Sequence, residues 1–377
     1  MSLERIARRI SERLPIVHGP LGKLRDLREV VAFSVDGLAP SAIRARPQKI
    51  TMAITAHCNL RCTGCRYGRD FMPGAQMSLE MAQAVIADAS RAGIGTLRLY
   101  GGEPLLHPQL PEMVASSLAA GIGTYVTTNA MLLEQKIDAL HEAGLRSITI
   151  GYYGTGARYD AYVQRPDKYR RLERGIAAVR ERYGNAVDVQ LNYLLMRPSC
   201  TVQAVDDAWA LAKRYDLKMR VDLVHYSLPY FTEGPDSSLQ FRAEDEPGIR
   251  AVVARLLEMK RADPKRLCES LEGIASIPDW LLLGSDMRVP CDAGKLIWIG
   301  ADGTVQLCYA AFPLGNLHQT PLGELIGTPA HDRAARNAYL LNCPNCHCER
   351  NDRITKHLPN RLKYAREAAR LGAATAT

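Results

Sequence analysis

The chain is organised around the apolar run Ile50-Thr-Met-Ala-Ile54 and the array Cys58-Asn-Leu-Arg-Cys62-Thr-Gly-Cys65 just after it. The apolar run predicts a buried strand, and the cysteines then lie in the loop that follows the strand. A 4Fe–4S cube has four irons, and proteins usually supply four thiolates to it. Three closely spaced thiolates therefore predict a cube with one iron open to another ligand. A zinc site completed by His57, or an incidental thiol cluster, remains the alternative.

A second motif, Tyr100-Gly101-Gly102-Glu103-Pro104, lies directly after another run that predicts a strand. Two successive glycines let the backbone approach a ligand closely, and a carboxylate beside them can pair with a cation. The motif is a weak signal alone, because ordinary turns often contain these residues. Its position at a predicted strand end, downstream of the three cysteines, makes the combination much more specific.

The two motifs together resemble those of the radical S-adenosylmethionine (SAM) superfamily. The resemblance implies that SAM chelates the open iron through its amino and carboxylate groups, while the glycine-rich turn holds its ammonium group. Cleavage of SAM would give methionine and a 5′-deoxyadenosyl radical, which takes a hydrogen atom from the substrate. The implied residues are Cys58, Cys62 and Cys65 for the cluster and Gly101, Gly102, Glu103 and Pro104 for SAM.

Two further positions are interpreted through the same resemblance. Val126-Thr-Thr-Asn-Ala130 is similar to the Thr-Asn-Gly turn of the superfamily, with alanine in place of glycine. We expect Thr128 and Asn129 near SAM or substrate, and a plain turn-forming role is the alternative. Asn192, on a predicted strand, is expected to contact SAM, unless it is a satisfied amide inside the barrel.

The chain also departs from the superfamily pattern in two places. The position before the third cysteine is often aromatic, and here it is Gly64, so we expect Tyr67 to take over stacking near the adenine. Gly151-Tyr-Tyr-Gly154 replaces the Ser-x-Asp-Gly of peptide-modifying relatives, so the substrate is expected to be held differently. We place Tyr152 and Tyr153 in the catalytic neighbourhood, with His225 and Arg220 as further guesses at the surroundings of a base.

Strands and helices alternate between residues 48 and 225. The alternation predicts a parallel sheet with right-handed crossovers, and with the resemblance it indicates an α/β fold, a partial (β/α)6 TIM-like barrel. Ligands of such a barrel lie at the carboxyl ends of the strands. The predicted strands are 49–55, 95–100, 122–127, 146–151, 187–195 and 218–224, and the predicted helices are 78–92, 108–120, 133–143, 167–183 and 201–215.

We divide the chain into five segments. Residues 1–47 are a helical extension with helices near 4–13 and 21–34, and residues 48–225 are the barrel core. Three segments follow: a variable part, 226–290, with helices near 244–261 and 265–274; a cysteine-bearing module, 291–355; and a C-terminal helix with a frayed tail, 356–377.

The module contains Cys291, Cys308, Cys343 and Cys346, with Cys348 just beyond. Two short apolar strands around an Asp-Gly turn predict a β-hairpin that brings the first two cysteines together. Four converging thiolates suit a second 4Fe–4S cluster, and a zinc knuckle is the alternative. The arrangement resembles the single-cluster "twitch" version of the SPASM auxiliary modules of radical SAM enzymes. Cys348 is spare, as a substitute ligand, a structural thiol or a reactive one.

Composition narrows the function classes. The chain has 377 residues, ten cysteines and a net charge of +8, and it contains no apolar run long enough to cross a membrane. The N-terminal residues lack the apolar region of a secretion signal, so we expect a cytoplasmic protein. The chain has no basic block interleaved with aromatic residues, so its composition does not indicate binding to nucleic acid. The charge permits an anionic substrate, although a solvated arginine-rich surface is the favoured explanation of it.

The resemblance leaves the reaction open. Our leading hypothesis is dehydrogenation of a small sugar or aminocyclitol alcohol, with the auxiliary cluster as electron acceptor. An epimerase with Cys268, placed on a helix, as hydrogen donor is the second, and a small buried side chain is the bland alternative for this cysteine. A ribosomal peptide maturase and an iron–sulfur electron carrier follow. SAM, two 4Fe–4S clusters, a small-molecule substrate and a reducing flavodoxin or ferredoxin are the expected cofactors and partners.

Overall fold

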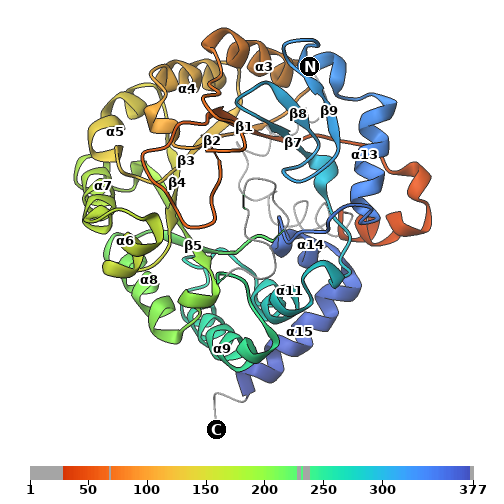
Figure 1. The fold of residues 1–377 in the computed structure, drawn as a ribbon. Helices are drawn as coiled ribbons and strands as arrows, with labels where there is room; N and C mark the ends of the chain where they lie inside the picture. Colours follow the sequence, from red (N-terminus) through yellow and green to blue (C-terminus); the bar gives the residue numbers. More distant parts are fainter. Residues whose placement is uncertain (1–28, 68, 227–230, 232–237, 374–377) are drawn as a thin grey trace, which may run out of the picture.

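The protein folds as an open α/β barrel, seen in Figure 1 down its axis with the helices outside the strands. This computed structural model describes residues 29–67, 69–226, 231 and 238–373. Six successive strands pair in parallel in their order along the chain, as the alternating pattern predicts. They are β1 (Lys49–Thr55), β2 (Thr96–Gly101), β3 (Gly123–Thr128), β4 (Ser147–Tyr152), β5 (Asp188–Leu195) and β6 (Lys218–Leu223).

The helices that cover this sheet confirm the five predicted within a few residues. Two of them begin at side-chain caps: the hydroxyl groups of Ser78 and Thr201 accept hydrogen bonds from backbone N–H groups three residues on. The sequence missed α6 (Ala157–Val163), a two-turn helix between β4 and the next long helix. The five predicted helices are α3 (Leu79–Arg91), α4 (Leu110–Ala119), α5 (Leu133–Glu142), α7 (Lys168–Tyr183) and α8 (Val202–Arg214).

The strands separate an apolar layer from a polar lumen. On β1, Ile50, Met52 and Ile54 are buried in the main core between sheet and helices. Residues of the opposite face, such as Lys49 on β1 and Arg98 on β2, line a cavity inside the barrel. Because successive side chains of a strand point to opposite faces, the same strands build both the core and a polar cavity.

The C-terminal module continues the barrel sheet. Its strands are β7 (Leu296–Ile299), β8 (Thr304–Gln306) and β9 (Pro313–Asn316). The predicted hairpin is present as the antiparallel pair β7–β8, and β9 adds to it. What the sequence did not indicate is that β7 also pairs in parallel with β1, so that all nine strands form one sheet.

The segment before this module differs from the prediction. The predicted helix 244–261 is present as α9 (Glu246–Ala262), but the predicted helix 265–274 is wrong over its first half. There the backbone runs extended along β6, with Leu267 bridged to Met219 and the Cys268 N–H donating to the Met219 carbonyl. The short helices α10 (Leu271–Ala275) and α11 (Ile277–Leu283) follow. Cys268 therefore lies at a sheet edge rather than on a helix.

The two ends of the chain complete the fold. The predicted helix 4–13 lies outside the described residues, and residues 29–35 are helical, at the end of the predicted helix 21–34. No helix in the described part of the chain is long and apolar enough to span a membrane. The C-terminal helices are α12 (Leu322–Leu325), α13 (Pro329–Tyr339), α14 (Arg350–Lys356) and α15 (Leu358–Ala373).

Candidate active site

The two glycines after β2 join the cysteine loop to the next strand. A Cβ atom built on Gly101 or Gly102 would overlap the carbonyl oxygens of Thr55 and His57. These same oxygens accept hydrogen bonds from the N–H groups of Gly102 (2.8 Å) and Glu103 (2.7 Å). Gly101 also has a φ of +143°, which side-chain-bearing residues rarely adopt. Only glycine lets the two loops approach this closely, so the motifs recognised separately in the sequence form one structure.

Glu103 is the buried carboxylate of this site. Its Oε1 accepts hydrogen bonds from the Thr128 hydroxyl (2.6 Å) and the Leu105 N–H (3.0 Å), and its Oε2 accepts from the Asn129 N–H (2.7 Å). Burial raises the pKa of Glu103 to about 7 despite these three donors. No cation of the described residues is among the causes of this shift. The ammonium group of a ligand would supply the positive charge that Glu103 lacks as a partner.

The turn after β3 is tied to both motifs. Asn129 donates to the Asn59 side chain (2.8 Å), and its own Oδ1 accepts from the Met131 N–H (3.0 Å). Its amide nitrogen also lies 3.9 Å from the sulfur of Cys58. Ala130 has a φ of +64°, the left-handed conformation in which glycine is favoured, so the alanine strains this turn slightly. Thr128 and Asn129 therefore hold the turn against Glu103 and the cysteine loop.

The three N-terminal cysteines fit a cluster better than a single ion. Burial raises the pKa of Cys58 to about 11, and it raises the pKa of Cys62, with Cys65 and Cys58 as further causes. Nowhere in the described ranges do three His, Cys, Asp or Glu side chains converge as ligands of one metal ion would. A cube binds each thiolate on a different iron, so it does not require that convergence.

An unused donor lies beside these thiols. The hydroxyl group of Tyr159, on α6, is buried and has no hydrogen-bond partner within the described structure. Cys62, Glu103 and Cys58 are all close enough to raise its pKa, after burial itself. A bound cluster or SAM would provide acceptors at this place. Tyr159 was not among the predicted site residues, because α6 itself was not predicted.

The missing aromatic residue of the cysteine loop is replaced from elsewhere. A Cβ built on Gly64 would lie 2.8 Å from the ring of Phe231, which forms an isolated β-bridge with Cys65. Tyr67, predicted for this role, is buried with Phe71 and Tyr100, at ring-centroid distances of 5.7 and 6.2 Å. Phe231 thus covers the loop where a side chain at position 64 would stand.

The barrel lumen contains a polar cavity of about 470 Å³. Asn192 lines it, donates to the Asp222 carboxylate (2.8 Å) and accepts from Gln190 (2.7 Å). It is therefore an inward-facing amide that already has partners. His225 lines the same cavity, and burial lowers its pKa to about 4. Its Nδ1 is buried without a partner among the described residues.

The three residues predicted to be catalytic lie in different places. Tyr152 is fully buried on the helix side of β4, where its hydroxyl group meets Thr155, so it faces away from the lumen. Tyr153 packs against Tyr162, with centroids 4.6 Å apart, and burial raises its pKa, with Cys62 as the next cause. The thiol of Cys268 contacts the Gln190 side chain (3.5 Å), which lines the lumen. Tyr153 therefore lies near the first cysteine cluster and Cys268 beside the lumen, whereas Tyr152 lies at neither place.

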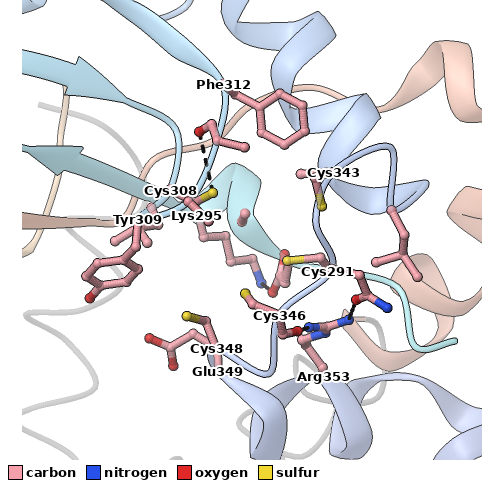
Figure 2. A pocket seen from close by; sticks show the side chains of 18 of the residues that line it. Cys291, Lys295, Cys308, Tyr309, Phe312, Cys343, Cys346, Cys348, Glu349 and Arg353 are labelled. Atoms are coloured by element: carbon pink, nitrogen blue, oxygen red, sulfur yellow. Dashed lines mark hydrogen bonds and ion pairs between the residues drawn. The ribbon is translucent and has the colours of Figure 1, made fainter. Parts of the chain in front are cut away.

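A second cavity, of about 240 Å³, gathers the C-terminal cysteines (Figure 2). Cys291, Cys308 and the turn that carries Cys343 and Cys346 bring four thiols into it from three separate segments, together with Cys348. A hydrogen bond with Cys348 lowers the pKa of Cys346 to about 6. The predicted ligand set is thus brought together by the fold, and the four thiols fit a second cluster.

Arg353 holds this cavity together, a role that no sequence motif indicated. Its buried guanidinium donates to the carbonyl groups of Val289, Pro290 (3.1 Å) and Cys346. It also lies 4.7 Å from the ring centroid of Trp280, in cation–π contact. One side chain therefore links the backbone ahead of Cys291 to the Cys346 turn.

The two cavities share a wall made of Lys49, Tyr309, Cys348 and Glu349, each of which lines both. Within this wall, Nζ of Lys49 forms an ion pair with Oε1 of Glu349 at 3.2 Å. The sulfur of Cys348 lies 3.6 Å from Nε2 of His225 on the lumen side. The cysteine cavity therefore adjoins the lumen directly.

Comparison with known proteins gives the class of this fold and site. Residues 52–222 match the Radical SAM superfamily, and they form a radical SAM domain, as the motifs predicted. The chain is 33% identical over 152 residues to the GTP 3′,8-cyclase of Chlorobaculum tepidum. This aligned stretch covers 39% of this chain and 45% of that protein. It is 26% identical over 306 residues to GTP 3′,8-cyclase 2 of Mycobacterium tuberculosis, which covers 77% of this chain and 81% of that protein.

Solved structures share the fold across most of the chain. The structure of anSMEcpe with bound AdoMet has a TM-score of 0.62 at 15% identity and covers 86% of this chain and 98% of that one. SuiB of Streptococcus suis has a TM-score of 0.60 at 14% identity and covers 90% of this chain and 81% of that one. At these identities the likeness establishes the architecture alone.

Proposed function

We propose that this radical SAM protein dehydrogenates a small sugar or aminocyclitol alcohol in the barrel lumen, with a second 4Fe–4S cluster as electron acceptor. The observation that carries the proposal is the shared wall: four residues line both the lumen and the cavity of the C-terminal cysteines. When bound, SAM and the two clusters supply the 5′-deoxyadenosyl radical and the electron acceptor. A reduced flavodoxin or ferredoxin would supply the first electron.

In this proposal the chain's own residues bind the cofactors, orient the substrate and exclude water. Glu103 and the glycine-rich turn hold the SAM ammonium group, and Cys58, Cys62 and Cys65 hold the first cluster. The second cluster is held by Cys291, Cys308, Cys343 and Cys346. Inside the lumen, Gln190, Asn192 and Asp222 form a connected row of polar groups that suits the hydroxyl groups of a polyol.

Oxidation of an alcohol to a ketone releases a proton, which needs an acceptor. His225 can relay this proton, because its Nδ1 is unpartnered in the described structure and its pKa of about 4 makes it a weak base that passes the proton on rather than holding it. It lines the lumen and contacts Cys348 in the shared wall. We assign the proton to His225.

Iron and sulfide per chain after anaerobic reconstitution test the proposal. We expect about eight irons, falling to about four when Cys58, Cys62 and Cys65 are replaced by alanine, and also to about four when Cys291, Cys308, Cys343 and Cys346 are replaced. Four irons falling to none in the first variant would remove the electron acceptor. The dehydrogenase reading would then fail, and a redox-neutral reaction such as epimerisation would replace it.

A second candidate is cyclisation of a purine nucleotide. It is favoured by the similarity to proteins named GTP 3′,8-cyclase over 77% of this chain. Incubation with SAM, dithionite and GTP, with analysis by mass spectrometry, separates the two candidates. A GTP-derived product formed together with 5′-deoxyadenosine supports the cyclase, and unchanged GTP removes it.

A further inference from the structure

Arg220 is a cation of the lumen that has no hydrogen-bond or ion-pair partner among the described residues. It lies on β6, opposite Asn192 of β5 in the parallel register, and its half-buried side chain lines the lumen cavity. Within the described structure its guanidinium forms neither a hydrogen bond nor an ion pair, although Glu269 and Asp222 lie near enough to raise its pKa. All five N–H donors of this side chain are therefore available.

The other cations of the cavity are all engaged. Lys49 pairs with Glu349 (3.2 Å). Arg98 donates to Thr127 (2.9 Å) and to the Tyr309 hydroxyl (3.1 Å). Arg350 donates to the carbonyl groups of Val221 (2.7 Å) and Gly273 (2.8 Å) and lies 3.7 Å from Glu269. Arg220 differs from them in having its donors free.

The nearby carboxylates are bonded to other groups. Glu269 accepts from the Val221 N–H (3.0 Å), and Asp222 accepts from Asn192 (2.8 Å). Glu349 is the acceptor for Lys49. These anions keep Arg220 charged without taking up its donors. A guanidinium held in this way presents a planar fork that matches a carboxylate or a phosphate with two parallel hydrogen bonds.

We infer that Arg220 anchors an oxoanion, a carboxylate or phosphate group of the molecule that occupies the lumen. Asn192 and Asp222 lie beside it and suit hydroxyl or amino groups of the same molecule. The substrate class is then a small polyhydroxylated molecule with one anionic group. The inference rests on the proposed function only in taking the lumen as the substrate cavity.

Thermal unfolding of the reconstituted protein in inorganic phosphate or in acetate, at constant ionic strength with chloride, tests the anion site. Arg170→Gln is the matched control, since Arg170 is exposed and the substitution removes the same charge. We expect a saturable rise in Tm for wild type and for Arg170→Gln, and none for Arg220→Gln. Arg220→Lys keeps the charge but loses the fork, so its half-saturating concentration should rise roughly tenfold.

The two probes distinguish the source of the oxoanion. Saturation at lower phosphate than acetate concentration indicates a phosphorylated substrate, and the reverse order indicates a carboxylate. The same saturable rise in Arg220→Gln as in wild type would overturn the inference, as would the lack of any rise in wild type. Arg220→Gln loses the attraction of Glu269 and Asp222, so its Tm in chloride is the baseline against which its response to each anion is measured. These measurements do not depend on catalytic turnover. The iron counts can therefore contradict the proposed function without contradicting the anion site, and the reverse.

Discussion

The two ends of the barrel lumen are built in opposite ways. At the SAM end, the functional groups follow directly after β1, β2 and β3, and backbone contacts between Gly102, Glu103 and the cysteine loop hold them together. At the auxiliary end, four cysteines come from three separate segments, and the buried side chain of Arg353 joins two of those segments. The first site depends on close backbone approach and the second on long-range side-chain bonds. The two should therefore fail separately.

Loss of a cluster ligand gives the largest effect and the sharpest separation of the two ends. Cys62→Ala should reduce formation of 5′-deoxyadenosine to the background level, because the first cluster loses one of its three thiolates. Cys308→Ala should retain SAM cleavage but lose substrate oxidation. Anaerobic product analysis by liquid chromatography measures both. If Cys308→Ala also abolished SAM cleavage, the two ends would not be independent.

Arg353→Met should damage only the auxiliary end. One buried and two partly buried carbonyl groups would lose their donor, which costs about 3–5 kcal/mol in the free energy of unfolding. Denaturant unfolding measures the loss, and iron analysis should show about four irons that remain with the first three cysteines. Arg333→Met, at an exposed arginine of α13, is the control and should behave as wild type. Equal iron in both variants would argue against the role of Arg353.

Gly102→Ala should damage only the SAM end. The new methyl group would overlap the His57 carbonyl, and separating the loops should cost about 2–3 kcal/mol of stability. Gly123→Ala is a fair control, because its Cβ would lie 3.5 Å from the nearest atom, the Gly95 carbonyl oxygen. Denaturant midpoints and SAM affinity report the change. An unaltered SAM affinity in Gly102→Ala would mean that the close approach has no role in binding.

The pH dependence of SAM affinity sharpens the role of Glu103. Its pKa is raised from 4.5 to about 7 in the folded protein, so it is largely protonated at pH 6 and cannot then pair with an ammonium group. Affinity for SAM should rise by up to about tenfold per pH unit below pH 7 and level off above it. Without SAM, this group's contribution to stability is present below pH 4.5 and is lost as pH rises towards 7. Glu103→Gln should flatten both profiles, and an unchanged binding profile would assign the ionisation to another group.

Cys268→Ala should have the smallest effect. In a dehydrogenase no hydrogen atom is returned to the substrate, so product formation should match wild type within about twofold. The thiol loses only its contact with Gln190. Turnover in deuterated water provides the second measurement. Solvent deuterium in the product of wild type, absent with Cys268→Ala, would favour the epimerase instead.

Much of the architecture could be predicted from local patterns. The apolar run of β1 and the caps of α3 and α8 are written in neighbouring residues, and the predicted boundaries hold within a few positions. The segment around Cys268 was predicted to be a helix, but in the structure it pairs with β6. That pairing joins residues far apart in the sequence, so no local pattern indicates it. Tyr159 and Phe231 were missed for the same reason. Each reaches the cysteine loop only through the tertiary fold.

The sequence by itself determined that the first three cysteines and the glycine-rich turn lie together, because both are short motifs at the ends of adjacent parallel strands. Parallel pairing brings such strand ends together whatever the rest of the chain does. Only the tertiary structure decided that the C-terminal cysteines adjoin the lumen, since that follows from the pairing of β7 with β1. It also decided that Arg220, alone among the lumen cations described, keeps its donors free. Which groups remain unbonded depends on every neighbour in the fold, and no local pattern encodes that.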